Sequence, residues 1–374
     1  MKREIIIDNA DKRRITNNKK KNVSASTVVP WHSLVFVTTM LFFFIYTFPS
    51  MESLDRVATI DTFRNVLFPK IISLRFIIAL RFVFAGIILW DCIDAILWGD
   101  WKQDTSYESS SKLTTVTIPF LGIYRQPKSN SIIHRILRGF LTMSSFTMLS
   151  WFLLGISFLL AGLIPLVVSY DDESNNDYYH HRSILSSPYV LRSALLLFEC
   201  SAPMTLLVSA VVKYHLWPNA SGHNVIVLKN PRTLLEHNGN VIMAITEISL
   251  LGGLPVRFQD FSIAPIFGIL YVFFTWWMMD KWTTTTTTKI NRSNNSHDDN
   301  DVGPQFCYPF FDTTLGWYTT VFLMVLLIIL SICYFLFSTM QTIIFQMKED
   351  DEGNNNIWTH LVSMITIIIL VCRF

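Results

Sequence analysis

The chain has 374 residues, of which 51% are hydrophobic and 16% are charged, with a net charge of +2. A soluble domain carries about 25% charged residues, so this composition excludes an ordinary soluble enzyme, and the small net charge gives no reason to expect nucleic-acid binding. The apolar residues come in long blocks, and membranes are spanned by helices of about 20 apolar residues. We therefore predict an all-α fold, a polytopic transmembrane helical bundle with about eight spans and at least six, surrounded by membrane lipids.

Residues 1–30 are polar and basic, and we expect a disordered cytoplasmic tail. Residues 31–48 form the first apolar run, which resembles a signal anchor more than a cleaved signal peptide because the preceding segment is long. Six of the other apolar blocks cover residues 72–98, 141–170, 189–212, 238–254, 262–279 and 317–345. Residues 357–372 form a marginal terminal span. Residues 280–313 are rich in Thr, Asn, Ser and Asp, a composition that cannot bury a core and is typical of a disordered loop.

The block 72–98 is the least uniform of these. Arg75 and Arg81 lie near one end, and Asp91 and Asp94 lie near the other. Long charged side chains near the ends of a span can extend to the interface, and we expect these arginines to do so.

Basic residues near the ends of the spans predict the orientation. The tail contains eight Lys and Arg residues and the segment 99–140 contains six, whereas the acidic segment 171–187 contains one. Because cytoplasmic loops are enriched in Lys and Arg, the tail and residues 99–140, 213–236 and 280–313 are assigned to the cytoplasm. Both ends of an eight-span chain would then be cytoplasmic, and an endomembrane such as the endoplasmic reticulum is the expected location.

The five cysteines include no CxxC pair, so neither a disulfide framework nor a cysteine-based metal site is expected. His180 and His181 lie in the acidic segment, where we expect them to be solvated. The sequence therefore predicts no metal and no cofactor.

The most informative stretch is residues 234–257, where one helix carries polar residues along a single stripe. His237, Asn240 and Glu247 fall within an arc of about 80° on a helix. Ionisable groups in an apolar helix are costly and often mark a functional site, but such a stripe can also join helices through hydrogen bonds. Both interpretations are retained.

The start of the third block contains a second polar face, formed by Ser144, Thr147 and Ser150. The predicted orientation places Thr147 and His237 at the same membrane face. A hydroxyl beside an imidazole is the minimum set of groups for an activated oxygen nucleophile, although Ser and Thr in membrane helices commonly bond to their own backbone.

Three segments carry a resemblance to a known family. Residues 146–158 read FTMLSWFLLGISF, residues 202–218 read APMTLLVSAVVKYHLWP, and His237 is followed ten positions later by Glu247. These segments resemble the androgen-induced and androgen-dependent membrane hydrolases, which are grouped with the rolling-stone proteins. The similarity covers roughly residues 74–345 and leaves out the tail, the first span and the last span.

The resemblance implies an intramembrane hydrolase of fatty acid esters of hydroxy fatty acids, with Thr147 as nucleophile and His237 as base. Thr142 in the preceding Leu-Thr pair can also be aligned as the nucleophile. The chain departs from the family at Leu234, where the hydrolases have an additional His, and at Asn238, where they have Thr.

Other residues receive supporting roles. Asn238 or Asn240 could hold the imidazole or donate to an oxyanion, and Glu247 could bind an adjacent helix or line an acyl cavity.

Two functions of other classes compete with the hydrolase. Asp91, Glu199 and Glu247 could form the path of a transporter or channel, or the chain could be a non-catalytic membrane scaffold.

Overall fold

A computed structural model describes residues 29–99, 101–106, 114–116, 124–126, 132–137, 139–173, 184–218, 223–278, 308–350 and 356–372. The predicted basic tail lies outside the described residues, apart from residues 29 and 30. So do His180, His181 and most of the predicted disordered loop 280–313.

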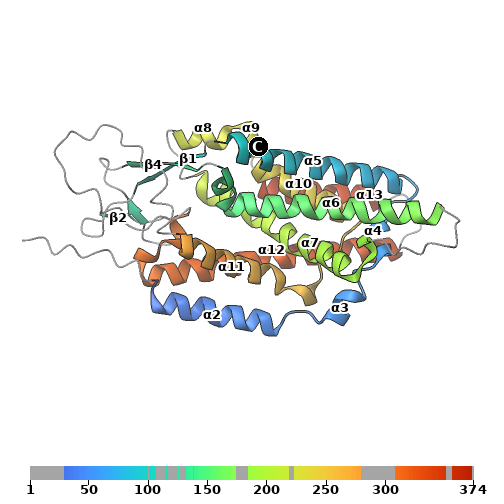
Figure 1. Cartoon of the computed structure of the whole chain (residues 1–374), viewed down its shortest axis with the longest axis horizontal. Coiled ribbons are helices and arrows are strands. Elements are labelled where there is room, and N and C mark those ends of the chain that lie inside the picture. The colour runs from blue at the N-terminus through green and yellow to red at the C-terminus, as the bar shows by residue number, and fades with distance from the viewer. Residues whose placement is uncertain are drawn as a thin grey trace, which may run out of the picture.

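The described residues form a bundle of helices aligned with the long axis of the molecule (Figure 1). Five helical segments are long and apolar enough to cross a membrane, by length and composition, at residues 74–98, 146–167, 188–216, 258–278 and 317–343. They correspond to all or most of helices α5 (Leu74–Trp98), α6 (Phe146–Glu173), α7 (Pro188–Val211), α11 (Ile263–Met278) and α12 (Trp317–Asp350). The described residues therefore form a helical bundle whose long helices are compatible with a multi-pass membrane protein.

The prediction of six to eight spans is not confirmed, because three of the expected spans are short. Helices α2 (Trp31–Tyr46) and α13 (Asn356–Val371) have 16 residues each, and α10 (Asn240–Ser249) has 10. At 1.5 Å per residue these helices are shorter than a hydrocarbon core of about 30 Å. The block expected at 238–254 ends early because a turn containing Gly252 and Gly253 follows, and Gly253 has a φ of 65°.

Small residues allow the central helices to approach closely. A Cβ atom added to Gly155 of α6 would lie 2.6 Å from the Ile88 side chain of α5, and one added to Gly162 would lie 3.3 Å from Phe82. Glycines at such contacts let the helices pack by van der Waals contact where the surrounding lipid gives no hydrophobic drive. The α5–α6–α7 layer forms the main hydrophobic core.

Shorter elements connect and cap these helices. They are α3 (Met51–Asp55), α4 (Ile60–Arg64), α8 (His223–Lys229), α9 (Pro231–Leu234), the 3-10 turns η1 (Gly139–Ser144), η2 (Ile184–Ser186), η5 (Phe258–Asp260), η6 (Pro309–Phe311) and η7 (Thr313–Leu315), and the π-helical turns η3 (Val212–Leu216) and η4 (Leu235–Gly239).

Four short strands were not expected from the sequence. Strand β1 (Trp101–Ser106) pairs antiparallel with β4 (Ile132–Leu137), and β2 (Thr114–Val116) pairs with β3 (Tyr124–Gln126). They lie beyond one end of the bundle, on the side of α8 and α9 (Figure 1). The bundle itself is helical as predicted.

Arg81 does not extend to the interface, which corrects the expectation from the sequence. Its side chain is fully buried and forms an ion pair with Glu247 of α10, with 2.6 Å between Nη2 and Oε1. Because an arginine in a dry interior is stable only when paired, the bond to Glu247 explains why Arg81 lies inside the bundle.

Candidate functional site

An apolar cavity lies between α2, α7, α11 and α12, beside the start of α6. Its lining is mostly Val, Leu, Ile, Met and Phe, and no charged side chain is among the residues that line it. Ligand pockets commonly combine an apolar lining with a few polar groups. This cavity fits that description.

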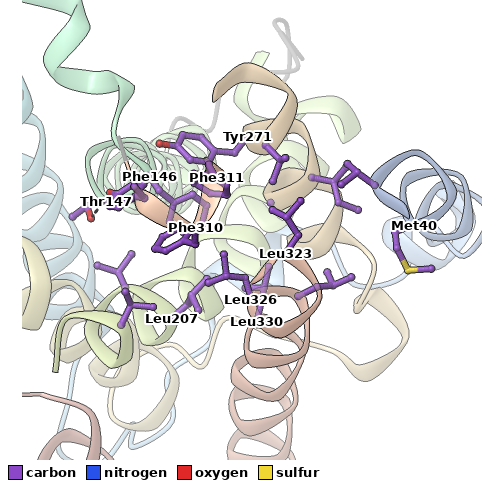
Figure 2. A pocket seen from close by; sticks show the side chains of 18 of the residues that line it. Met40, Phe146, Thr147, Leu207, Tyr271, Phe310, Phe311, Leu323, Leu326 and Leu330 are labelled. Carbon is purple, nitrogen blue, oxygen red and sulfur yellow. Dashed lines mark hydrogen bonds between the residues drawn. The ribbon is translucent and has the colours of Figure 1, made fainter. Parts of the chain in front are cut away.

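Thr147 lines the cavity at one side (Figure 2). It lies in the first turn of α6, and Ser145 begins that helix by accepting a hydrogen bond from the Met148 backbone N–H at 3.1 Å. The Thr147 Oγ1 atom lies 3.5 Å from the hydroxyl of Tyr308, which precedes η6 and also lines the cavity. Two hydroxyl groups therefore meet at an otherwise apolar wall.

The other hydroxyls of the predicted polar face are bonded to backbone carbonyls. The Ser144 Oγ atom donates to the Leu141 carbonyl at 2.5 Å, and Ser150 Oγ donates to the Thr147 carbonyl at 2.9 Å. Ser144 also belongs to η1 and not to α6. Of the three predicted hydroxyls, only Thr147 points its oxygen toward another side-chain hydroxyl.

Thr142, the alternative nucleophile, lies in η1 and is buried. Its hydroxyl donates to the Gly139 carbonyl at 2.7 Å, and Thr142 is not among the residues that line the cavity. Within the described structure, Thr147 is therefore the better placed of the two threonines to meet an apolar ligand.

His237 lies in the π-helical turn η4, which directly precedes α10. His237 as a whole is partly exposed, but its Nδ1 atom is buried and has no hydrogen-bond partner among the described residues. Burial lowers the pKa of His237 to about 4, so the imidazole is neutral near pH 7 and can accept a proton. Local π-helical turns are frequent at functional sites.

Ser209 and Asn240 position the turn that carries His237. The Ser209 hydroxyl of α7 donates to the His237 carbonyl, and lies 3.4 Å from the Asn240 Oδ1 atom. The same Oδ1 atom accepts the Val241 backbone N–H at 2.6 Å, and the buried Nδ2 atom of Asn240 has no partner in the described part of the chain. The Asn238 carbonyl faces Cys372, whose Sγ atom lies 3.8 Å away.

Thr147 and His237 lie at the same end of the bundle, on elements that touch. Trp151, one turn after Thr147, donates from Nε1 to the Oδ2 atom of Asp91 at 3.1 Å. Arg232, just before η4, lies 2.9 Å from the Oδ1 atom of the same aspartate. Helix α6 also contacts η4. No direct bond between Thr147 and His237 is found among the described residues, and His237 is not part of the cavity lining.

Three carboxylates, those of Asp91, Asp94 and Glu236, surround the guanidinium of Arg232, and these four residues are called the Arg232 cluster. Arg232 also pairs with Asp94 at 2.5 Å and with Glu236 at 3.1 Å. Burial, reinforced by the nearby Asp91 carboxylate, raises the pKa of Glu236 to about 7. This cluster is therefore a site at which protonation changes close to neutral pH, next to His237 in the sequence.

The two remaining predicted residues, Glu247 and Glu199, lie away from this end. Glu247 is ten residues after His237, and Glu199 is ten residues before Ser209, whose hydroxyl bonds the His237 carbonyl. Ten residues of helix span about 15 Å at 1.5 Å per residue. The Glu247 carboxylate pairs with Arg81, while the Glu199 Oε1 atom accepts the Arg257 backbone N–H at 3.2 Å and lies 3.8 Å from the Arg257 Nε atom. Neither is among the residues that line the cavity.

Reasoning from the sequence missed Tyr308, Ser209 and the α2 wall of the cavity. Tyr308 follows a long low-complexity stretch and lies 161 residues from Thr147, so no local pattern joins them. Ser209 is a single hydroxyl in an apolar helix, which by itself indicates nothing more than a bond to its own backbone.

Comparison with known proteins gives no significant match: none to a protein-family model, none to a curated protein and none to a solved structure. The site is therefore interpreted from its own geometry and from the sequence resemblance described above.

Proposed function

We propose that this protein is a membrane-embedded hydrolase of lipid esters, of the class of fatty acid esters of hydroxy fatty acids, with Thr147 as nucleophile and His237 as base. The observation that carries the proposal is that Thr147 lines an apolar cavity next to the hydroxyl of Tyr308. An ester bound with one acyl chain in the cavity would bring its carbonyl carbon to the Thr147 oxygen.

The reaction would proceed through an acyl-enzyme. His237 accepts the proton of Thr147 as Oγ1 attacks the ester carbonyl, and the imidazolium returns that proton to the departing alcohol when the C–O bond breaks. Water then attacks the acyl-threonine with His237 again as base, releasing the fatty acid and restoring the threonine. The Tyr308 hydroxyl is suited to donate to the oxyanion of each tetrahedral intermediate.

The placement of His237 supports its role as the base. Its carbonyl is held by Ser209 and its turn contacts α6. In this reading Glu247 and Glu199 stabilise the bundle and take no part in the chemistry, as their ion pairs indicate. An endomembrane location with the tail in the cytoplasm remains part of the proposal.

The test is labelling of detergent-solubilised membranes with a lipid-like fluorophosphonate, which reacts with activated hydroxyls. Wild type should label, and both Thr147→Ala and His237→Ala should lose the label at unchanged expression. Thr142→Ala is included because Thr142 is the alternative nucleophile. Thr342→Ala is the matched control, since Thr342 is exposed on α12 and, within the described structure, bonds only the carbonyl of Ser338.

The outcomes separate the interpretations. Loss of labelling in Thr142→Ala with retention in Thr147→Ala moves the nucleophile to η1 and keeps the hydrolase. Wild type that neither labels nor cleaves a lipid ester contradicts the hydrolase altogether.

A non-catalytic scaffold is the second candidate, and one observation favours it over a transporter. Each of the three carboxylates proposed for a transport path is engaged by an arginine: Asp91 by Arg232, Glu199 by Arg257 and Glu247 by Arg81. Carboxylates held in this way join helices and leave no chain of free acids for an ion to follow. A scaffold tolerates Thr147→Ala without loss of function, whereas the hydrolase does not.

A further inference from the structure

Helix α2 has two distinct faces. Its outer face is exposed, with Trp31 at 75%, Phe42 at 67% and Val35 at 54%. Its inner face is buried at Ser33, Val37 and Phe44, which follow one another at helical spacing. Since the outer face is as apolar as the inner one, it suits contact with lipid chains.

The inner face of α2 packs against α11 and α12. The Ser33 hydroxyl lies 2.7 Å from that of Thr320 in α12, and Phe44 packs edge-on against Phe261 beside α11. Between these two attachments, Phe36, Val37 and Met40 line the cavity. Helix α2 therefore closes the cavity as a wall fixed at both of its ends.

This wall lies across the cavity from Thr147. Figure 2 shows Thr147 at one side and Met40 at the other, with Phe310 and Leu323 between them. Helix α2 packs on α11 and α12, whereas α6 packs on α5 and α7. A straight ligand that begins at Thr147 and runs along the cavity thus ends at α2.

The lining defines the chemistry of the occupant. It combines aliphatic and aromatic side chains, with the hydroxyls of Thr147 and Tyr308 close together at one side and no charged group among the residues that form it. Burying a charged ligand in such a lining would be strongly unfavourable. A saturated acyl chain fits the apolar walls, and the uncharged ester to which it is attached fits beside the two hydroxyls.

We propose that α2 fixes the length of the acyl chain that the protein accepts, with Met40 as the residue at which the chain ends. The proposal rests on the proposed function, because it places the ester at Thr147. It adds a specificity-determining helix that lies outside the segments resembling the hydrolase family.

The first experiment measures hydrolysis of p-nitrophenyl esters of straight-chain acids, from short to long, by purified full-length protein. Met40→Trp fills the end of the cavity and should lower kcat/KM for long chains relative to short ones, by roughly 10-fold or more for each methylene that is excluded. Met40→Ala should shift the preference toward longer chains. Val35→Trp is the matched control, because it adds the same ring to the exposed face of α2, and it should leave the profile unchanged.

The second experiment is independent of hydrolysis. A fatty ester with a diazirine at the far end of its chain is photolysed with the protein, and the labelled peptides are identified by mass spectrometry. Label should appear on residues 36–40 and should be competed by unlabelled ester.

The two experiments distinguish the two proposals. If wild type cleaves no ester but residues 36–40 are labelled, the hydrolase fails while the acyl site ended by α2 stands. If esters are cleaved but Met40→Trp slows all chain lengths equally, or the label falls on helices other than α2, the chain-length proposal is overturned and the hydrolase stands. Should Met40→Trp not fold, Met40→Ala and the labelling of wild type decide in the same way.

Discussion

Arg81 and Glu247 form a bidentate ion pair between α5 and α10, in which Nε lies 3.1 Å from Oε2 and Nη2 lies 2.6 Å from Oε1. Both side chains are fully buried. The Arg81 Nη1 group also donates to the carbonyls of Phe63 at 2.8 Å and Ala161 at 3.0 Å. One guanidinium therefore joins α4, α5, α6 and α10.

We predict that removing either partner of this pair strongly destabilises the bundle. Glu247→Leu or Arg81→Met leaves one buried charge without its counter-ion, which costs about 3–5 kcal/mol. The double variant Arg81→Met with Glu247→Leu removes both charges and should recover much of that loss. The measurement is the thermal unfolding midpoint of purified protein in detergent. A double variant no more stable than the worse single variant would contradict this account of the pair.

Gly252 depends on the same pair. A Cβ atom at this position would lie 2.1 Å from Arg81 Nη2 and 2.8 Å from Glu247 Oε1. Such distances are impossible, and the ion pair is too tightly held to move without cost, so Gly252→Ala should lower the unfolding midpoint. Gly86→Ala is the matched control, because nothing lies within 4 Å of its added Cβ. Replacing a mid-helix glycine by alanine also favours the helix by about 0.5–1 kcal/mol, so the control should be neutral or stabilising.

These contacts explain which parts of the structure could be predicted from sequence. Long apolar blocks indicated the helices of the bundle, because a 20-residue apolar run has few other stable arrangements. The fate of Arg81 could not be predicted, since snorkelling and burial differ only in whether a partner lies nearby, and Glu247 is 166 positions away. Local periodicity carries no information about such distant pairs.

Part of the geometry around the candidate site residues could be predicted in the same way. Placing Thr147 and His237 at one end of the bundle required only the order and direction of the helices, and the two residues do lie on touching elements. The cavity could not be foreseen, because its walls come from helices that are far apart in the chain and its volume depends on how they pack. Likewise, the bond from Ser209 to the His237 carbonyl joins residues 28 positions apart, which no local pattern predicts.

The predicted orientation can be tested through glycosylation. The four Asn-X-Ser sequons begin at Asn22, Asn219, Asn291 and Asn294, and all are assigned to the cytoplasmic side by the distribution of Lys and Arg. Expressed in a eukaryotic cell, the wild-type protein should show no mobility shift on treatment with a glycosidase. A sequon introduced into the acidic segment 171–187, which is assigned to the opposite side, should acquire a glycan. Modification of any native sequon would reverse this assignment.

Glu236 should make stability depend on pH near neutrality. Its pKa in the folded protein is raised to about 7 from an ordinary value of 4.5, mainly by burial. Folded protein then holds a proton that unfolded protein has lost, so stability falls as pH rises from about 4.5 to about 7, by about 1.4 kcal/mol for each unit of pKa difference. Below this range both states are protonated, and above it both are ionised, so the slope vanishes.

The measurement is the unfolding midpoint as a function of pH for wild type, Glu236→Gln and Glu52→Gln. Glu236→Gln retains the shape of the side chain but cannot ionise, so its stability should change less between pH 4.5 and 7 than that of wild type. Glu52 pairs with Arg56 at the surface, with 77% of its side chain exposed, and Glu52→Gln should keep the wild-type slope. Equal changes of stability with pH in all three proteins would contradict the prediction. Glu236 would then titrate as an exposed carboxyl does, and folding would not raise its pKa.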